Sequence, residues 1–209
     1  MKAALALVLI PFFCSAQVKS YPGVLLLKTG TTLTGKITVN LTGENKNLIT
    51  IETSTNPEGK KKREKTSLST NLQEFLNPVI IKSLIIDNQT YYFFDLRNEI
   101  DEKKNLTGCL VKKMLGNDTI GLFQWQDSTG KTSHYVLPPL TKGILTNIEH
   151  PDFSGNHFQI ISFSYGRCRT VSKKMYDKVE GYYYDNEKDA IDTKIKVWTN
   201  IIQSYINCQ

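Results

Sequence analysis

The chain has 209 residues, of which 40% are hydrophobic and 22% charged, and its formal net charge is +6. This balance is typical of a folded globular protein and argues against a disordered chain. The length suits one or two domains and is enough to bury a core without support from a metal. The positive excess is modest, and much of it lies in one basic run.

The N-terminus has the parts of a secretory leader. Lys2 provides a basic start, residues 3–13 form an apolar run, and small residues follow up to Ala16. We expect cleavage between Ala16 and Gln17. A membrane-spanning helix needs ~20 apolar residues, so this run is too short to be one. The sequence therefore predicts an exported mature chain, periplasmic or secreted, with no transmembrane segment.

A second interpretation of the leader makes the protein a lipoprotein that carries its lipid on Cys14. Phe12 and Phe13 are bulky at positions where a lipidation signal usually has small residues. The soluble exported form is therefore the favoured hypothesis.

The clearest strand pattern covers residues 31–42. Apolar and polar residues alternate there, as in a strand with one buried face and one wet face. Residues 23–28 form an apolar run that ends in a Thr29-Gly30 turn, so the two segments predict a hairpin. Residues 47–53 alternate again and are expected to pair next. The residues predicted on the buried face are Leu33, Gly35, Ile37, Val39 and Leu41.

A basic run follows the turn cluster at residues 56–59. We interpret it as a solvated loop between strands. The alternative is a contact with phosphate head groups or a polyanionic glycan. No aromatic residues interleave with the run, which argues against nucleic acid as a partner. The residues of this anion contact would be Lys60, Lys61, Lys62 and Arg63.

Five further strands are predicted, separated by polar turns. Residues 71–76 are expected to form a helical turn before them. Pro138 and Pro139 are expected to end the sheet, because proline cannot donate to a strand ladder. The predicted strands cover residues 78–86, 90–96, 108–115, 119–126 and 132–137.

The pattern becomes helical after Glu149. Two short helices are expected, one from Asp152 and one over residues 169–179, and a longer helix follows near the C-terminus. Asp185 or Asn186 is expected to cap the start of this last helix. Its apolar stripe consists of Ile191, Ile195, Trp198, Ile202 and Tyr205.

The order of these segments predicts an α+β fold. A β-rich domain over residues 17–149 would form an antiparallel β-meander, as a sandwich or an open barrel. A helical segment over residues 150–209 would then pack on the sheet.

Three cysteines remain after cleavage of the leader. Disulfides persist outside the cytosol, and three cysteines allow at most one intramolecular pair. Cys109 lies in a predicted strand among apolar neighbours, where a buried thiol is tolerated. We predict a disulfide between Cys168 and Cys208, formed when the terminal helix folds back across the earlier helical pair, with Cys109 reduced.

The sequence contains no pattern that predicts catalysis or a cofactor. A GxSxG elbow, a P-loop and a dinucleotide-binding glycine pattern are all missing from it. Glu149, His150, Asp152 and His157 lie close in the sequence, but their spacing matches no metal site. We therefore predict no catalytic residue, no metal and no cofactor.

Two further patterns bear on glycans. Clustered aromatic residues are interpreted as core, with a sugar-stacking platform as the alternative; they are Tyr91, Tyr92, Phe93, Phe94, Trp125, Tyr182, Tyr183 and Tyr184. Asn-x-Thr triplets would be glycosylation acceptors in a eukaryotic secreted protein, although they also suit turns. These triplets begin at Asn40, Asn88, Asn105 and Asn117.

Several short segments resemble a group of uncharacterised exported β-rich proteins of Bacteroidota. They are the leader end Ser15-Ala16-Gln17, the strand pair GVLLLKTGTTLTGKI, the strand pair over residues 81–94, the turn GNDTIGLFQW and the ending Tyr205-Ile206-Asn207-Cys208. The ending departs from the group's pattern, because Ile206 separates the tyrosine from the asparagine. The resemblance implies a bacterial cell-envelope setting and no activity.

The first hypothesis for function is a non-enzymatic interaction protein of the cell envelope or the secreted fraction. It would have a protein or another envelope component as its partner. The alternative is a carbohydrate- or polyanion-binding module that uses the aromatic strands or the basic run. A hydrolase with an unobvious site is a further alternative.

Overall fold

The computed structural model describes residues 19–42, 49–53, 72–76, 78–96, 105–117, 119–141, 144–149 and 155–208. The predicted cleavage site at Ala16 and Gln17 and the predicted anion contact at Lys60, Lys61, Lys62 and Arg63 lie outside these residues.

Strands occupy the first part of this described chain and helices the last. The strands are β1 (Lys19–Leu27), β2 (Thr32–Val39), β3 (Ile49–Thr53), β4 (Leu72–Leu76), β5 (Ile81–Ile86), β6 (Gln89–Leu96), β7 (Leu106–Gly116), β8 (Gly121–Gln126), β9 (Thr132–Leu137) and β10 (Thr146–Asn147). The helices are α1 (Gly155–Ser162), α2 (Arg169–Tyr176) and α3 (Ile191–Ile206), with short 3-10 turns η1 (Pro78–Ile80) and η3 (Phe163–Tyr165).

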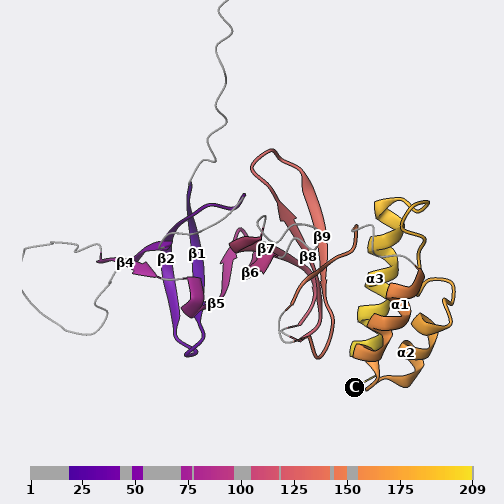
Figure 1. The fold of residues 1–209 in the computed structure, drawn as a ribbon. Helices are drawn as coiled ribbons and strands as arrows, with labels where there is room; N and C mark the ends of the chain where they lie inside the picture. Colours follow the sequence, from indigo (N-terminus) through magenta and orange to yellow (C-terminus); the bar gives the residue numbers. More distant parts are fainter. Residues whose placement is uncertain are drawn as a thin grey trace, which may run out of the picture.

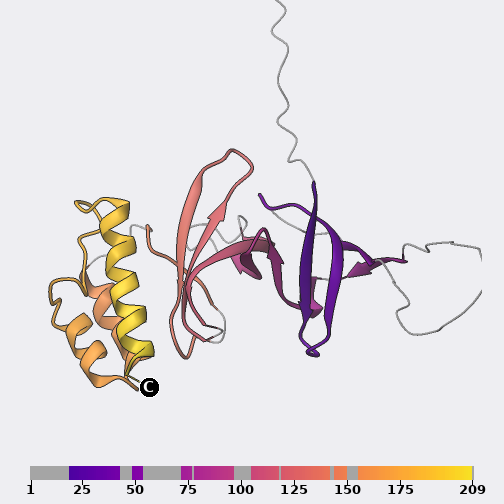
Figure 2. The same ribbon diagram turned by 180° about the vertical axis from the view of Figure 1, so that it is seen from behind.

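All described strands belong to one antiparallel sheet with the order β10-β9-β8-β7-β6-β5-β1-β2-β3-β4. It consists of two meanders, β1–β4 and β5–β10, joined where β1 pairs with β5. Figures 1 and 2 show β1–β4 at one end of the molecule, β7–β9 further along, and the helices at the other end. The predicted α+β class with a β-meander and a C-terminal helical segment is confirmed. The strands form a single open sheet instead of the two sheets of a sandwich.

The predicted alternation in the second strand is confirmed. Ile37 and Val39 are buried, whereas Thr34 and Lys36 on the other face are exposed. Gly35 lies on the buried face opposite Gly23 of β1, and a Cβ atom on it would overlap the backbone carbonyl of Glu52. A side chain at this position would therefore push β2 and β3 apart.

The hairpin between β5 and β6 shows how turn residues set the register. Its two-residue loop is Asp87-Asn88, and both residues have positive φ, 50° and 59°. Positive φ at both central residues defines the turn whose twist matches that of paired strands, and Asn and Asp tolerate it better than most residues. The sequence Asp87-Asn88-Gln89 thus places Ile86 opposite Gln89.

The helices form the largest buried cluster together with one end of the sheet. Trp198, Ile201 and Ile202 of α3 are fully buried, and they belong to the same cluster as Leu122 of β8 and Val136 of β9. The helical segment therefore covers the β7–β9 end of one sheet face, as predicted.

Three details of the predicted elements were wrong. The sheet does not end at Pro138 and Pro139, because β10 follows them and pairs with β9. Residues 72–76 form strand β4, which pairs with β3, and not a helical turn. The helix α3 begins after Ala190, which makes no side-chain cap, so neither Asp185 nor Asn186 caps it. Asn186 instead accepts two hydrogen bonds from the buried Lys194 ammonium, at 2.9 Å and 2.6 Å. A buried ammonium needs such partners more than a helix end near solvent does.

The predicted disulfide joins Cys168 to Cys208, with Cα atoms 5.9 Å apart. It links the start of α2 to the residues that follow α3. Cys109 stays out of this bond and is buried in β7. No helix among the described residues combines the length and the apolar content that crossing a membrane requires.

Removing the disulfide should destabilise the helical segment. The bond spans 40 residues of sequence, and the chain-entropy model gives roughly 4 kcal/mol for a loop of that size. We expect the double variant Cys168→Ser/Cys208→Ser to melt at a lower temperature. Hydrogen exchange should become faster in α2 and α3 and change little in β1–β5.

A reductant provides the control for this prediction. It should lower the melting temperature of the wild type and leave that of the double variant unchanged. A double variant as stable as the oxidised wild type would contradict the role of the bond.

Candidate functional site

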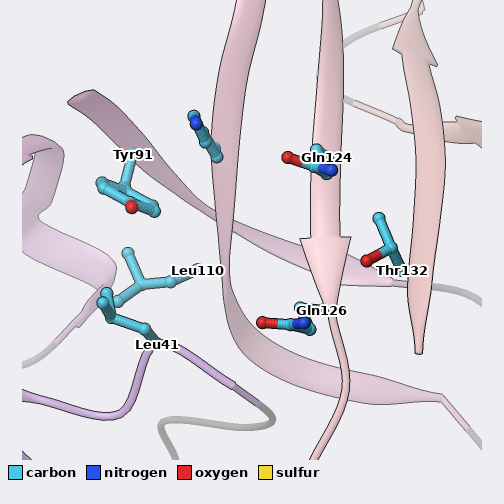
Figure 3. A pocket seen from close by; sticks show the side chains of 7 residues that line it. Leu41, Tyr91, Leu110, Gln124, Gln126 and Thr132 are labelled. Atoms are coloured by element: carbon cyan, nitrogen blue, oxygen red, sulfur yellow. The ribbon is translucent and has the colours of Figure 1, made fainter. Parts of the chain in front are cut away.

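A hollow of about 300 Å³ lies on one face of the sheet (Figure 3). Its walls come from strands β6–β9 and from Leu41, which lies shortly after β2. The residues that line it are Leu41, Tyr91, Leu110, Lys112, Gln124, Gln126 and Thr132.

Strand register explains why these side chains meet. Tyr91 of β6 pairs with Lys112 of β7, and Lys112 pairs with Gln124 of β8. Directly paired residues point to the same face of a sheet, so the three side chains form one row. Gln126 pairs with Thr132 of β9 and lies two residues beyond Gln124, so it belongs to the next row on that face.

The same sheet face also carries the helices. Leu122, two residues before Gln124, and Val136 of β9 both belong to the cluster formed with α3. Along β8, this face therefore changes from a buried leucine under the helices to two glutamines in an open hollow.

Most polar groups of the hollow have no partner within the described part of the chain. No intramolecular hydrogen bond is made there by the side chains of Lys112, Gln124 and Thr132 or by the hydroxyl of Tyr91. Gln126 donates a hydrogen bond from Nε2 to the carbonyl of Gly130, at 3.1 Å. These side chains, half-buried except for the exposed Gln126, thus present donors and acceptors inside the hollow.

The walls differ in chemistry. Figure 3 shows Leu41, Tyr91 and Leu110 on one side, and Gln124, Gln126 and Thr132 on the other. Burial is the largest cause that raises the pKa of the Tyr91 phenol above its usual value, so this group stays neutral near pH 7. The hollow therefore combines an apolar wall with an amide and hydroxyl wall.

A histidine–carboxylate pair continues the row of Lys112 and Gln124. His134 of β9 pairs with Gln124 and is buried. Glu149 Oε1 accepts hydrogen bonds from His134 Nδ1, at 3.1 Å, and from the His134 backbone N–H, at 2.9 Å. The carboxylate holds the imidazole in one orientation and connects β9 to the residues after β10.

The structure describes two of the four residues that were considered as metal ligands, Glu149 and His157. Glu149 contacts His134, and His150 and Asp152 lie outside the described residues. His157 lies on α1. No group of three or more His, Cys, Asp or Glu side chains within the described ranges is placed to hold a metal ion.

A second group of polar side chains connects the helices. Tyr182 shares a hydrogen bond with Ser204 of α3, at 2.8 Å, and Lys174 of α2 donates to the Tyr182 hydroxyl, at 3.4 Å. The Ser204 hydrogen bond, followed by Lys174, lowers the pKa of Tyr182. None of these residues lines the hollow, so we assign them a role in joining α2 to α3.

Most of the clustered aromatic residues are part of the core. Tyr92, Phe94 and Phe123 contact one another through their rings, and Tyr184 packs edge-on against Phe158. Only Tyr91 among the predicted aromatic residues lines the hollow.

Sequence reasoning missed Lys112, Gln124, Gln126 and Thr132. A signal was present in β8, whose sequence is GLFQWQ. Gln124 and Gln126 occupy the positions that continue the face of the buried Leu122, and two amides on such a face indicate that it opens there.

Comparisons of the chain with families of known proteins, with curated proteins and with solved structures found no match. The interpretation of the hollow therefore rests on its own geometry.

Replacing Glu149 should test the connection between β9 and the segment after β10. Glu149→Ala leaves the buried His134 ring and its backbone N–H without their acceptor. We expect a loss of roughly 1–2 kcal/mol in the free energy of unfolding, measured by urea denaturation. Glu149→Gln keeps an acceptor oxygen and should lose less.

The matched control is Glu187→Ala, which removes an exposed carboxylate. Its stability should stay within about 0.5 kcal/mol of the wild type. Equal stabilities for all three variants would show that the contact with His134 contributes nothing.

Proposed function

We propose that the protein is an exported, non-enzymatic interaction protein that binds a small ligand in the hollow on its sheet. The observation that carries this proposal is the composition of the hollow, which offers amide, hydroxyl and ammonium groups beside an apolar wall.

The same composition favours binding over catalysis. General acid–base chemistry needs a carboxylate or imidazole close to the reacting group, and nucleophilic chemistry needs a nucleophile beside a base. The described residues that line the hollow include no carboxylate, imidazole or thiol. His134, which continues the row beyond Gln124, has Nδ1 engaged by Glu149.

Export is supported by two features of the chain. The leader pattern ends in small residues before Gln17. The Cys168–Cys208 disulfide is of a kind that persists outside the reducing cytosol. The resemblance to uncharacterised exported proteins of Bacteroidota agrees with a location in the cell envelope or the secreted fraction.

Export is tested by expressing the full chain with its own leader in a bacterial host. Mass spectrometry of the periplasmic and extracellular fractions should find a mature chain that begins at Gln17. The variant Ala16→Phe should accumulate uncleaved, because signal cleavage requires a small residue before the cut. An intact Met1 in the cytosol would contradict export, and a lipid on Cys14 would establish the lipoprotein form instead.

Binding is tested by ligand-observed NMR with a panel of neutral sugars, sugar acids, amino acids, nucleosides, dicarboxylates and short peptides. At least one class should show saturation transfer from the wild type. The variant Thr132→Trp fills the hollow from its edge and should abolish that signal. Spectra after one day should show the ligand unchanged. A panel without any binder, or a bound compound that is converted, would overturn the proposal.

A further inference from the structure

We infer that the hollow binds a sugar that carries a carboxylate, such as a single uronic acid ring. This inference deepens the proposed function and rests on it, because it names the class of ligand for the same hollow.

The apolar wall suits the face of a sugar ring. Tyr91 and Leu110 come from neighbouring strands, and Leu41 approaches them from the N-terminal half of the sheet (Figure 3). One face of a pyranose exposes mainly C–H groups, which pack against an aromatic ring or aliphatic side chains. Leu110 is buried, so the accessible part of this wall comes from the half-buried Tyr91 and Leu41, which pack against the cluster that contains Leu110.

The opposite wall suits sugar hydroxyls. A hydroxyl both donates and accepts, and so does a primary amide or another hydroxyl. Gln124 and Thr132 provide these groups without any intramolecular partner in the described chain, and Gln126 adds an acceptor oxygen. An array of neutral donors and acceptors recognises a polyhydroxylated molecule better than it does an apolar one.

The charge of the hollow selects for an acid. Lys112 is the ionised group among the described lining residues, and none of those residues is acidic. Glu149, the carboxylate near the end of the row, is engaged by His134. A ligand carboxylate would therefore form a charge-assisted hydrogen bond with the ammonium of Lys112, a half-buried residue.

The volume limits the size of the ligand. Pockets for small molecules measure roughly 300–1,000 Å³, and this hollow, at about 300 Å³, is at the lower end of that range. It accommodates one ring with its substituents better than a nucleotide or a folded peptide.

The chain offers a matched control for the charge. Lys113 follows Lys112 in β7 and so points to the opposite face of the sheet. Its ammonium lies 3.4 Å from the Tyr92 hydroxyl and over the Tyr92 ring. Lys112→Gln and Lys113→Gln remove the same charge from the same strand, and only the first removes it from the hollow.

The experiment compares glucuronate with glucose, and galacturonate with galactose, by NMR titration of the mature disulfide-bonded protein. The wild type should bind at least one acid roughly 10-fold or more tightly than its neutral counterpart, because hydrogen bonds to charged groups contribute more than neutral ones. Lys112→Gln should lose that preference, and Lys113→Gln should keep it. Added salt should weaken the binding of the acid and leave the affinity for the neutral sugar unchanged.

Each other result has a distinct meaning. One such result is that neither acid binds, while another compound of the wider panel binds to the wild type and no longer binds to Thr132→Trp. In that case the class of ligand is wrong and the proposed function stands. If no compound of the panel binds, both are wrong. An equal loss in Lys112→Gln and Lys113→Gln, or acid binding that survives Lys112→Gln unchanged, would overturn the assignment of Lys112. Melting temperatures equal to that of the wild type confirm that both variants are folded.

Discussion

The pairing of β1 with β5 is the contact on which the rest of the sheet depends. Other neighbouring strands in the described sheet follow one another along the chain, whereas β1 lies between β2 and β5. Through this pairing Leu25 is placed opposite Leu84, and both are completely buried. The two meanders become one sheet because β1 pairs with β2 along one edge and with β5 along the other.

The hollow is a consequence of the same pairing. Leu110 of β7 belongs to the cluster formed mainly by β1–β5, and Leu41 packs against that cluster. The N-terminal half of the sheet thus supplies part of a wall, while the polar residues come from β7–β9. Gly23 permits the close approach, since a Cβ atom there would lie 2.6 Å from the carbonyl oxygen of Ile85. A separate N-terminal meander would leave the polar face of β7–β9 flat and open.

The sequence predicted well those features that depend on neighbouring residues. The polar turn before it and the prolines after it identified the strand at Thr132–Leu137 with its observed bounds, and the step of three or four identified α3. The disulfide was predictable because few cysteines were available and two of them flank helices. The strand β4 was missed because its partner β3 lies far before it in the sequence. The residues of β4 alone do not indicate this pairing.

Apart from the two glutamines of β8, the hollow could not be predicted for a similar reason. Its side chains come from four strands and one strand end, and each looks like an ordinary polar or apolar residue in its own segment. Only the cross-strand register of Tyr91, Lys112 and Gln124 brings them into a row. The predicted cap of α3 was wrong because Asn186 was assigned from its local position alone. Its side chain instead accepts a hydrogen bond from the buried Lys194, eight residues later.

The division of one sheet face between helices and hollow has an energetic basis. Along β8 the face passes from Leu122, buried under α3, to Gln124 and Gln126. Covering a glutamine amide with apolar helix residues would cost roughly 1–3 kcal/mol if no partner replaced water. The helical segment is therefore stable over Leu122 and Val136 but not over the glutamines. The disulfide joins the C-terminal end of α3 to the start of α2. The helical segment thus covers the apolar part of this face and leaves the polar part open.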